Sequence, residues 1–502
     1  MIEHYEKQSK EQLIEALVGA QLSHDSLRTS HDSLRFDNLK LRAELDQLKR
    51  LIFGSRSERF VPPEDQAQTA LAFDQELQAV QPTVAPQTIT YERSKTKASQ
   101  HINTGRRPLP ANLERVVIVI EPLQDVTGLK KIGQDITEEL ELSPARFFVN
   151  QYIRPKYAKA NGEGVLIGEL PSRPIEKGIP GPGLLASILI EKYVDHLPCY
   201  RQIQRFERAG VTIAASTMSE WISAGVDLIA PLYEVLKKEV LSSGYIQADE
   251  TPIKVMDKDK KGTTHRGYYW VYHAPEKNLV LFDYRAGRGR EGPATILSNF
   301  KGYLQTDGYA AYDSFDTQQI KLFNCMAHAR RYFEKALDND RVRAEFALAC
   351  IQKLYAVERH CREGRFTNDQ RKLYREGEAL GVLDELQQWL IREIINVPPQ
   401  SPMGKAMSYM LARWERLCVY VQDGRLEIDN NLVENAIRPV AVGRKNYLFA
   451  GSHNAAQRAA MIYSLLGSCK KNGVEPLAWM KNVLTSINEC KANKLALLLP
   501  KC

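Results

Sequence analysis

Apolar side chains recur at seven-residue intervals through the first 55 residues. One seam of this repeat consists of Leu13, Ala20, Leu27, Leu34, Leu41 and Leu48. The companion seam consists of Leu17, Leu45 and Ile52 with the polar residues His24, His31 and Asn38. This period predicts a coiled coil over residues 1–55, in which the polar seam residues fix register and oligomeric state. A single amphipathic helix packed on its own domain is the alternative, but the phase holds for about five heptads and favours self-association.

The repeat ends at Gly54, and two other patterns follow it. Residues 56–100 are rich in Pro, Gln, Thr and Ala, which predicts a linker. Over residues 101–178, short β-like runs such as RVVIVIE and RFFVNQYIRPKYA alternate with Gly and Pro. This alternation predicts a small β-rich module.

Residues 179–240 have a helical pattern with a turn signal inside it. A helix ending at Ala209, a turn at Gly210-Val211 and a second helix opening at Ser216-Thr217 are typical of a helix-turn-helix. Because helix pairs joined by a glycine turn are common, plain packing is an equal alternative to DNA binding on this motif alone. We interpret residues 179–240 as a helix-turn-helix-like DNA-binding region and keep plain helix packing as the alternative.

Strand patterns begin at residue 245. The runs YIQADETPIKV, HRGYYWVYHA and NLVLFDYRA predict three strands, the last two joined by a turn at Pro275-Glu276-Lys277. A helix over EGPATILSNF, a strand over GYLQTDGYAAY and a strand leading into a helix over IKLFNCMAHARRYF are expected next. Residues 334–425 read as helical and charged. A further helix opens at Asp429-Asn430, and we expect Pro439 to end it.

Composition leaves the functional class broad but excludes a membrane protein. A chain of 502 residues is too long to fold around a single hydrophobic core, so several domains are expected. Its net charge of +7 permits a polyanionic partner. All eight cysteines lie from Cys199 onward without a CxxC pair, which predicts reduced thiols in a cytoplasmic protein. We find no apolar run of about 18 residues, so no membrane span is expected.

Two of the predicted strands end in the same way. YIQADE and YLQTDG each place an aspartate four residues after a tyrosine, at Asp249 and Asp307. If these strands are parallel neighbours, both carboxylates lie at the carboxyl edge of the sheet, where α/β sheets bind ligands. Two carboxylates about 4 Å apart repel, so the pair predicts two bound Mg²⁺ or Mn²⁺ ions. For Asp307 alone, a simple turn after a strand is the alternative.

A third ligand is expected from DNNLVENAIRP. Asn431, Glu434 and Arg438 share one face of the predicted helix, which places a carboxylate between an amide and a guanidinium. Residues 435–474 then carry no acidic side chain and six basic ones, namely Arg438, Arg444, Lys445, Arg458, Lys470 and Lys471. This suits a phosphate backbone held against an anionic metal site. A helix that is merely N-capped is the alternative.

These motifs together resemble the insertion-sequence-66 family of bacterial transposases. The resemblance is carried by ADETPIKV, LQTDGYAAYD, CMAHARRYF and DNNLVENAIRPVAVGRKNYLFAGS, and it extends over nearly the whole chain. It implies an α/β RNase H-like catalytic domain of the DDE type, with Asp249, Asp307 and Glu434 as catalytic triad and metal ligands. Within this domain, residues 241–333 and 426–472 form the core, 334–425 an all-helical insertion, and 473–502 a C-terminal helical element.

The chain departs from the family in the β-rich module. Family members often carry a zinc-ribbon-like element with CxxC pairs here, whereas residues 101–178 contain no Cys. Because a structural zinc site needs such thiolates, we expect a degenerate module without zinc. The pair Cys325 and His328 alone is not a zinc site either.

The resemblance implies metal-dependent strand cleavage followed by transfer of the freed 3′-hydroxyl to target DNA. Seven residues are expected to contact DNA, namely His328, Arg330, Arg331, Asn431, Arg438, Arg444 and Lys445. Glu250 points away from Asp249 by strand alternation and is given a supporting role with Asn430.

The expected partners are double-stranded DNA, at the terminal inverted repeats and the target, and further copies of the chain. Because both ends of an element must be cut and joined together, a homodimer or larger assembly is expected, with small companion proteins from the same element as further partners. Two other classes stay open. One is a non-catalytic DNA-binding accessory protein, and the other is an RNase H-like nuclease that cuts without joining.

Overall fold

The computed structural model describes residues 109–501, apart from residues 110, 112, 125, 128–129, 144–145, 159–163, 177 and 258–261. They belong to one compact unit, Asn103–Cys502. The coiled coil predicted over 1–55 and the linker predicted over 56–100 lie outside the described residues. Among the described helices, none is long and apolar enough to cross a membrane.

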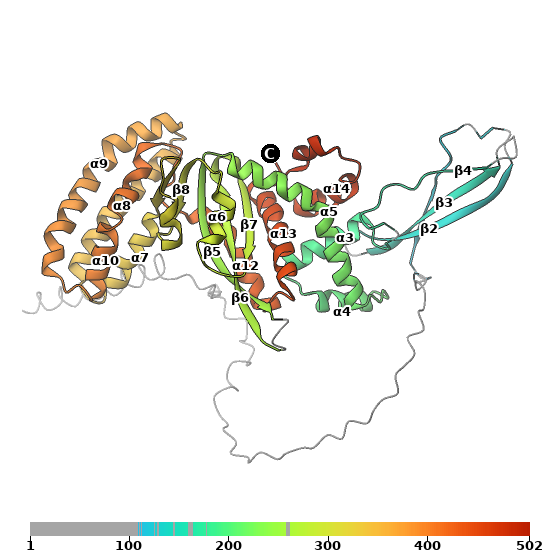
Figure 1. The fold of residues 1–502 in the computed structure, drawn as a ribbon, viewed down its shortest axis with the longest axis horizontal. Coiled ribbons are helices and arrows are strands. Elements are labelled where there is room, and N and C mark those ends of the chain that lie inside the picture. Colours follow the sequence, from blue (N-terminus) through green and yellow to red (C-terminus); the bar gives the residue numbers. More distant parts are fainter. Residues whose placement is uncertain are drawn as a thin grey trace, which may run out of the picture. The chain divides into compact units, whose positions relative to one another are not determined.

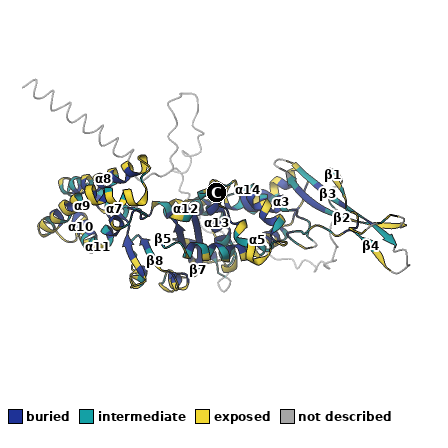
Figure 2. Ribbon diagram, turned by 90° about the horizontal axis from the view of Figure 1, so that it is seen from above, coloured by how far each residue is buried: buried dark blue, intermediate teal, exposed yellow. Residues whose placement is uncertain are grey.

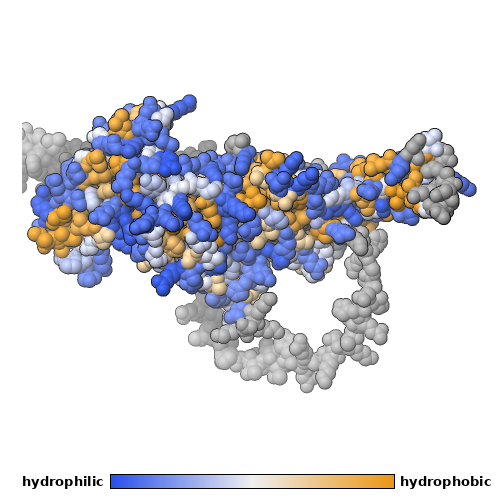
Figure 3. Space-filling model, turned by 45° about the horizontal axis from the view of Figure 1, so that its top comes forward, coloured by the Kyte–Doolittle hydropathy of each residue, from blue (hydrophilic) through white to orange (hydrophobic). Residues whose placement is uncertain are grey.

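A mixed sheet comes first in the described chain (Figure 1). Its strands are β1 (Arg115–Val119), β2 (Lys131–Ser143), β3 (Arg146–Ala158) and β4 (Val165–Ile167). β3 pairs parallel with β1 and antiparallel with β2 and β4. Hydrophobic residues gather on the surface over this sheet (Figure 3). Val119 of β1 and Ile136 of β2 are 56% and 53% exposed.

Three helices connect this sheet to the next. They are α3 (Pro182–Tyr193), α4 (Cys199–Arg208) and α5 (Ala215–Leu241). The predicted turn between α4 and α5 is confirmed, and Gly210 there has φ +80°, a conformation that favours glycine. The carboxylate of Glu141 in β2 accepts the N–H groups of Gly183 and Leu184 at 3.1 and 2.6 Å, so it satisfies free donors in the first turn of α3.

The second sheet has five strands in the order β7-β6-β5-β8-β9. They are β5 (Tyr245–Met256), β6 (Thr264–Ala274), β7 (Leu279–Arg285), β8 (Gly302–Thr306) and β9 (Ile320–Asn324). β6 and β7 form an antiparallel hairpin around η1 (Pro275–Lys277), whereas β8 and β9 run parallel to β5 and β8. The fourth strand is shorter than expected, because the chain after Asp307 turns into η2 (Ala310–Phe315). α6 (Glu291–Leu297) precedes β8 as predicted.

Helices follow β9 without a further strand until α12. They are α7 (Met326–Ala336), α8 (Arg341–Glu363), α9 (Asn368–Glu393), η3 (Ile394–Asn396), α10 (Pro402–Leu411), α11 (Trp414–Cys418) and η4 (Val419–Gln422). Their buried side chains form a core with Tyr245 of β5 and Phe323 of β9. Neighbouring Ile246 belongs to a second core with α3, α5 and α13, because successive strand residues face opposite sides. Figure 2 shows buried residues on the strands that lie between the helices α7–α11 and the helices α5 and α13.

The chain ends in α12 (Asn431–Tyr447), α13 (His453–Lys471), α14 (Pro476–Ser486) and η5 (Ala492–Leu498). The expectation that Pro439 ends α12 is wrong, because the helix continues through it for eight residues, to Tyr447. Burial of Val433, Ala436 and Val440 on one side of α12 outweighs the lost hydrogen bond. α13 covers edge strand β7, whose Val280 and Phe282 N–H groups donate to Ser468 and Ser464 at 3.0 and 2.7 Å.

Candidate active site

Asp249 and Asp307 lie at the same edge of the five-stranded sheet. β5 and β8 pair in parallel with the register Tyr245↔Tyr303 and Gln247↔Gln305. Asp249 and Asp307 each follow two residues after the last of these pairs, and Asp307 comes directly after β8. The prediction that the two strands are parallel neighbours is therefore confirmed.

Backbone donors orient both aspartates. Asp249 Oδ1 accepts the N–H of Glu250 at 2.8 Å, and Asp307 Oδ1 accepts the N–H of Tyr309 at 2.8 Å. The carbonyl of Asp307 accepts the hydroxyl of Tyr409 from α10 at 2.7 Å. Gly308 has φ +89°, and a Cβ there would lie 2.7 Å from Arg413 Nε. The turn after β8 therefore fits closely against the helices that follow the sheet.

A buried glutamine pair connects these strands to the helix that carries Glu434. Gln247 Nε2 donates to Gln305 Oε1 at 2.9 Å and to the Asp429 carbonyl at 2.9 Å, while its Oε1 accepts the N–H of Val433 at 3.2 Å. Tyr245 Oη donates to the same Gln305 oxygen at 2.6 Å. Both glutamines are fully buried. The sequence interpretation missed them, although the repeated pattern Tyr-x-Gln-x-Asp on β5 and β8 was a visible signal.

Glu434 lies in the first turn of α12 and faces α7. Its Oε1 is 3.8 Å from His328 Nε2 and 3.8 Å from Arg331 Nη2. Across the described parts of 109–501, no three His, Cys, Asp or Glu side chains lie close enough together to hold a metal ion. In this conformation Glu434 therefore pairs with basic side chains of α7 and does not complete a cluster with Asp249 and Asp307.

The electrostatics of the three carboxylates are nevertheless coupled. Burial, together with the charges of Glu250, Asp307 and Glu434, raises the pKa of Asp249 well above its usual range. Burial also raises the pKa of Glu434, with Arg331 opposing and Asp307 adding to the shift. Burial and the charge of Arg331 lower the pKa of His328. The site thus concentrates negative charge that a cation would relieve.

Glu250 has a cationic partner of its own. Its Oε1 accepts Arg288 Nε at 2.9 Å and Nη2 at 2.6 Å. The guanidinium of Arg288 also lies 4.1 Å from the ring centroid of Tyr309, two residues after Asp307. Arg288 was not among the residues predicted from the sequence.

The other predicted residues have different surroundings. Arg330 pairs with Glu334 at 3.1 Å, and Arg444 donates to the carbonyl of Pro252. Asn431 donates its side-chain amide to Asp429 at 2.7 Å. Arg438 and Lys445 are exposed on α12.

Asn430, at the start of α12, is fully buried, and its N–H donates to Cys325 Sγ at 3.3 Å. Within the described chain, neither polar atom of its side-chain amide has a hydrogen-bond partner. A buried amide in this state is costly unless a polar ligand meets it.

Comparison with known proteins gives this arrangement a family. Residues 177–458 match the family described as Transposase IS66 family. The chain belongs to the IS66 family of transposases. Residues 40–118 match "Transposase C of IS166 homeodomain", and residues 464–500 match "IS66 C-terminal element". The resemblance inferred from the motifs is confirmed, and it supports a transposase of an insertion element.

Three similar proteins come from Sinorhizobium fredii. The uncharacterized protein y4hP is 30% identical over 492 residues, covering 92% of this chain and 88% of the relative. The uncharacterized protein y4qI is 32% identical, with coverage of 92% and 88%. The uncharacterized protein y4jD is 31% identical, with coverage of 92% and 94%. The likeness to each relative therefore extends over most of both chains.

The expectation of a module without zinc is overturned by a further match. Residues 125–158, which include β2 and β3, match "zinc-finger binding domain of transposase IS66". The prediction was based on the absence of Cys thiolates. The segment matches the zinc-finger element of the family even without them. The matched residues themselves contain neither Cys nor His.

Proposed function

We propose that this chain cleaves the ends of its insertion element and joins them to target DNA, in the manner of a DDE transposase. The chemistry is phosphoryl transfer at Asp249, Asp307 and Glu434. One observation carries the proposal. Asp249 in β5 and Asp307 after β8 each lie two residues beyond the parallel pairing of these strands, and Gln247 hydrogen-bonds the first turn of the Glu434 helix to the same place on the sheet.

The sheet supports an RNase H-like catalytic domain. Its central strand β5 pairs antiparallel with β6 and parallel with β8, in the order β7-β6-β5-β8-β9. β8 ends at Thr306 beside the middle of β5, so Asp307 stands at the carboxyl end of a parallel strand, which is where open α/β sheets bind ligands. Residues 334–425 are proposed as an insertion into this domain.

The donor set fits Mg²⁺ or Mn²⁺, because both ions prefer carboxylate oxygens. Asp249 and Asp307 would hold the metal, and Glu434 would join them once its carboxylate leaves His328 and Arg331 of α7. Asn430 adds an unpartnered amide at the start of the same helix as Glu434. When bound, the metal supplies Lewis-acid chemistry, lowering the pKa of the attacking water and neutralising charge on the phosphate. Because burial and neighbouring charges raise the pKa of Asp249, a proton competes with a cation for this carboxyl, and metal affinity is expected to rise with pH.

The chain's own residues hold the DNA. Arg331 and His328 lie 3.8 Å from the Glu434 carboxylate. Because these side chains also bind phosphate, a DNA phosphate is proposed to take the place of Glu434 as their partner. Arg330, Asn431, Arg438, Arg444 and Lys445 are proposed as further DNA contacts. α4 and α5 are proposed as a helix-turn-helix-like unit that binds the element ends, and residues 1–55 as the coiled coil that pairs two chains.

Cleavage and joining of a duplex carrying the element's own terminal repeat test the proposal. The full chain is expected to cut this duplex in Mg²⁺ and to join the freed 3′-hydroxyl to a second DNA. Asp249→Asn, Asp307→Asn and Glu434→Gln are expected to bind the duplex but to cut it at least about 10³-fold more slowly, because each loses a metal ligand worth several kcal/mol.

Three results contradict parts of this proposal. Cutting by Asp249→Asn at the wild-type rate would remove Asp249 from the site. Cutting without joining would make the chain an RNase H-like nuclease. Specific binding with no cutting by the wild-type chain would favour an accessory DNA-binding protein.

A further inference from the structure

The segment 423–430 leads directly into α12 and is held by the sheet on one side. Tyr245 Oη accepts the N–H of Glu427 at 3.1 Å, and Gln305 Nε2 donates to the Glu427 carbonyl at 2.9 Å. Gln247 Nε2 donates to the Asp429 carbonyl at 2.9 Å. These bonds fix the backbone of the segment against β5 and β8.

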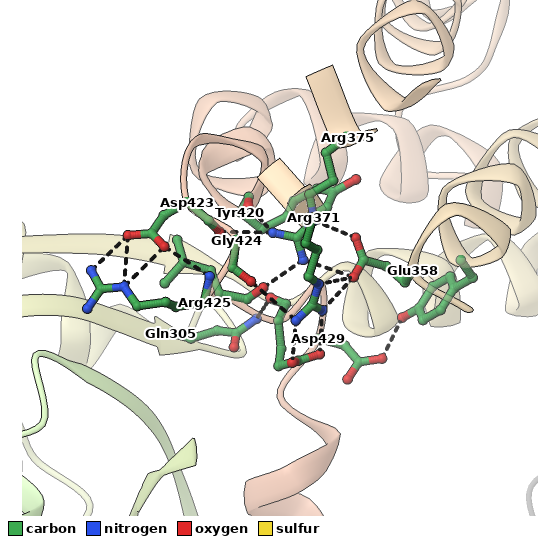
Figure 4. Close-up of polar contacts among 12 residues, drawn as sticks. Gln305, Glu358, Arg371, Arg375, Tyr420, Asp423, Gly424, Arg425 and Asp429 are labelled. Carbon is green, nitrogen blue, oxygen red and sulfur yellow. Dashed lines mark hydrogen bonds and ion pairs between the residues drawn. The ribbon is translucent and has the colours of Figure 1, made fainter. Parts of the chain in front are cut away.

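The side chains of the same segment are held by α8 and α9. Arg371 of α9 forms two parallel bonds to Glu427, with Nη1–Oε1 at 2.9 Å and Nη2–Oε2 at 3.0 Å. Tyr355 of α8 donates its hydroxyl to Asp429 Oδ2 at 2.9 Å. Figure 4 shows these contacts converging on the segment from the helices. Glu427 and Asp429 are therefore each bound by the sheet through the backbone and by the helices through the side chain.

A buried charge cluster supports this second set of contacts. Glu358 of α8 accepts Arg371 Nε at 3.1 Å and Arg375 Nε at 2.7 Å. Arg375 also donates to the carbonyls of Tyr420, Asp423 and Leu426 at 2.7 to 2.9 Å. The side chains of Arg375, Glu358 and Arg371 are 0%, 1% and 11% exposed. Such a cluster is rigid, because any charge that loses its partner stays buried and uncompensated.

A cluster that only stabilised the insertion would have no reason to reach past residue 426. Arg371 and Tyr355 do reach past it, to residues seven and five positions before Glu434. Asp429 in turn accepts the N–H and the side-chain amide of Asn431 at 3.1 and 2.7 Å, in the first turn of α12. A continuous set of hydrogen bonds therefore runs from α8 and α9 to the turn that carries Glu434.

We propose that Tyr355, Arg371 and Glu427 are positioning residues through which the insertion sets the place of Glu434 in the site. The inference rests on the proposed function of Glu434 as a metal ligand. The helical insertion thus helps to position a residue of the catalytic domain. Loosening its contacts with segment 423–430 lets α12 begin in more than one position, which weakens metal binding before it affects folding.

Two mild substitutions in the full-length chain test this. Tyr355→Phe removes one hydroxyl. Glu427→Gln removes the charge of the side chain but keeps its shape and the hydrogen bonds of the Glu427 backbone to Tyr245 and Gln305. Matched controls are Tyr374→Phe, whose ring stacks on His360 in the same helical region, and Glu393→Gln, whose carboxylate pairs with Arg343. The controls leave segment 423–430 with all its partners.

Two quantities are measured for each variant. The first is amide hydrogen exchange over residues 430–436 without metal. The second is the Mg²⁺ concentration that gives half-maximal cutting of the terminal-repeat duplex. Tyr355→Phe and Glu427→Gln are each expected to speed the exchange about tenfold and to raise the Mg²⁺ requirement about tenfold, the effect of losing one hydrogen bond to a charged group. High Mg²⁺ should recover part of the rate, and both controls should behave as wild type.

Unchanged exchange over 430–436 in both test variants, with a lower unfolding temperature, would overturn the inference and leave the cluster a purely stabilising one. Faster exchange in a chain that never cuts DNA would leave the positioning intact and reject the proposed function instead. Equal effects in test and control variants would also overturn the inference.

Discussion

Asp249 and Glu250 are adjacent in sequence, yet the chain surrounds them differently. Glu250 has the guanidinium of Arg288 within 2.6 Å, whereas Asp249 accepts one backbone N–H and faces other carboxylates. A half-buried carboxylate that lies near other carboxylates and has no cation destabilises the fold. Asp249 is therefore a residue that the chain keeps at the expense of stability, as is typical of functional sites.

Neutralising Asp249 should stabilise the metal-free chain. The pKa of Asp249 in the folded chain is raised above its unfolded value by burial and neighbouring charges, so the folded state holds the proton more tightly. By linkage, its contribution to stability is most favourable below the unfolded pKa and is lost as the pH rises towards the folded pKa. Asp249→Asn should raise the unfolding temperature at neutral pH by about 2 °C or more and flatten its decline with pH.

Thermal unfolding in a metal chelator, followed from about pH 4 to pH 8, checks this prediction. Asp338→Asn is the control, because Asp338 is exposed on the surface. A lower unfolding temperature for Asp249→Asn than for the control at neutral pH would show that Asp249 has a stabilising partner.

At the scale of elements, the five strands, the β6–β7 turn and the parallel pairing of β5 with β8 were predictable because each carried a clear signal. The runs from Tyr245 and from Gly302 have matching residues at matching spacing, and the structure pairs them in register. Pro439 misled because local propensity disfavours proline inside a helix, whereas buried contacts on both sides of it keep α12 intact. Such contacts depend on distant residues, so no local pattern reports them.

The site itself was predictable only in part, for the same reason. The choice of Asp249, Asp307 and Glu434 came from strand ends and helix spacing, which are local features. The hydrogen bonds that bring α12 to the sheet join residues more than 180 positions apart, as between Gln247 and Val433. A buried glutamine reads as an ordinary polar residue until its partners are known. The pairing of Glu434 with α7 was equally invisible, because it depends on how two helices meet.

Gln247 is expected to be essential for the junction between β5 and α12. Gln247→Ala removes three buried hydrogen bonds at once, those to the Val433 N–H, the Asp429 carbonyl and Gln305. The Val433 N–H keeps its bond to the Asn430 carbonyl, and Gln305 keeps its bonds to Tyr245 and Glu427. At about 1 kcal/mol for each lost bond, the free energy of unfolding should fall by about 3 kcal/mol. Urea unfolding measures this, with Gln319→Ala as an exposed control. A loss below about 0.5 kcal/mol, the ordinary range for surface changes, would show that the junction is held by apolar packing alone.

At the scale of the whole molecule, the described residues account for the proposed chemistry but not for bringing two DNA ends together. Asp249, Asp307 and Glu434 come from three separate segments that one sheet and one helical insertion hold in place. A single such site acts on one strand at a time, whereas a mobile element has two ends. Pairing of two chains would bring two such sites together, and residues 1–55 carry a heptad repeat of the kind that pairs chains.

The last prediction concerns that repeat, which stays a prediction because it lies outside the described residues. Leu34→Asp puts a charge into the proposed seam, whereas Ser33→Asp adds the same charge one position outside it. Losing a leucine from the seam of a coiled coil is worth about 2 to 3 kcal/mol, so the proposal expects Leu34→Asp to weaken self-association about a hundredfold. Sedimentation equilibrium of the full-length chain measures the association, and gel shifts with one or two terminal-repeat duplexes measure pairing of ends. Leu34→Asp should still bind one duplex but fail to hold two, and Ser33→Asp should do both. If both variants self-associate as strongly as wild type, residues 1–55 form a helix packed on their own chain, and the two ends meet through another surface.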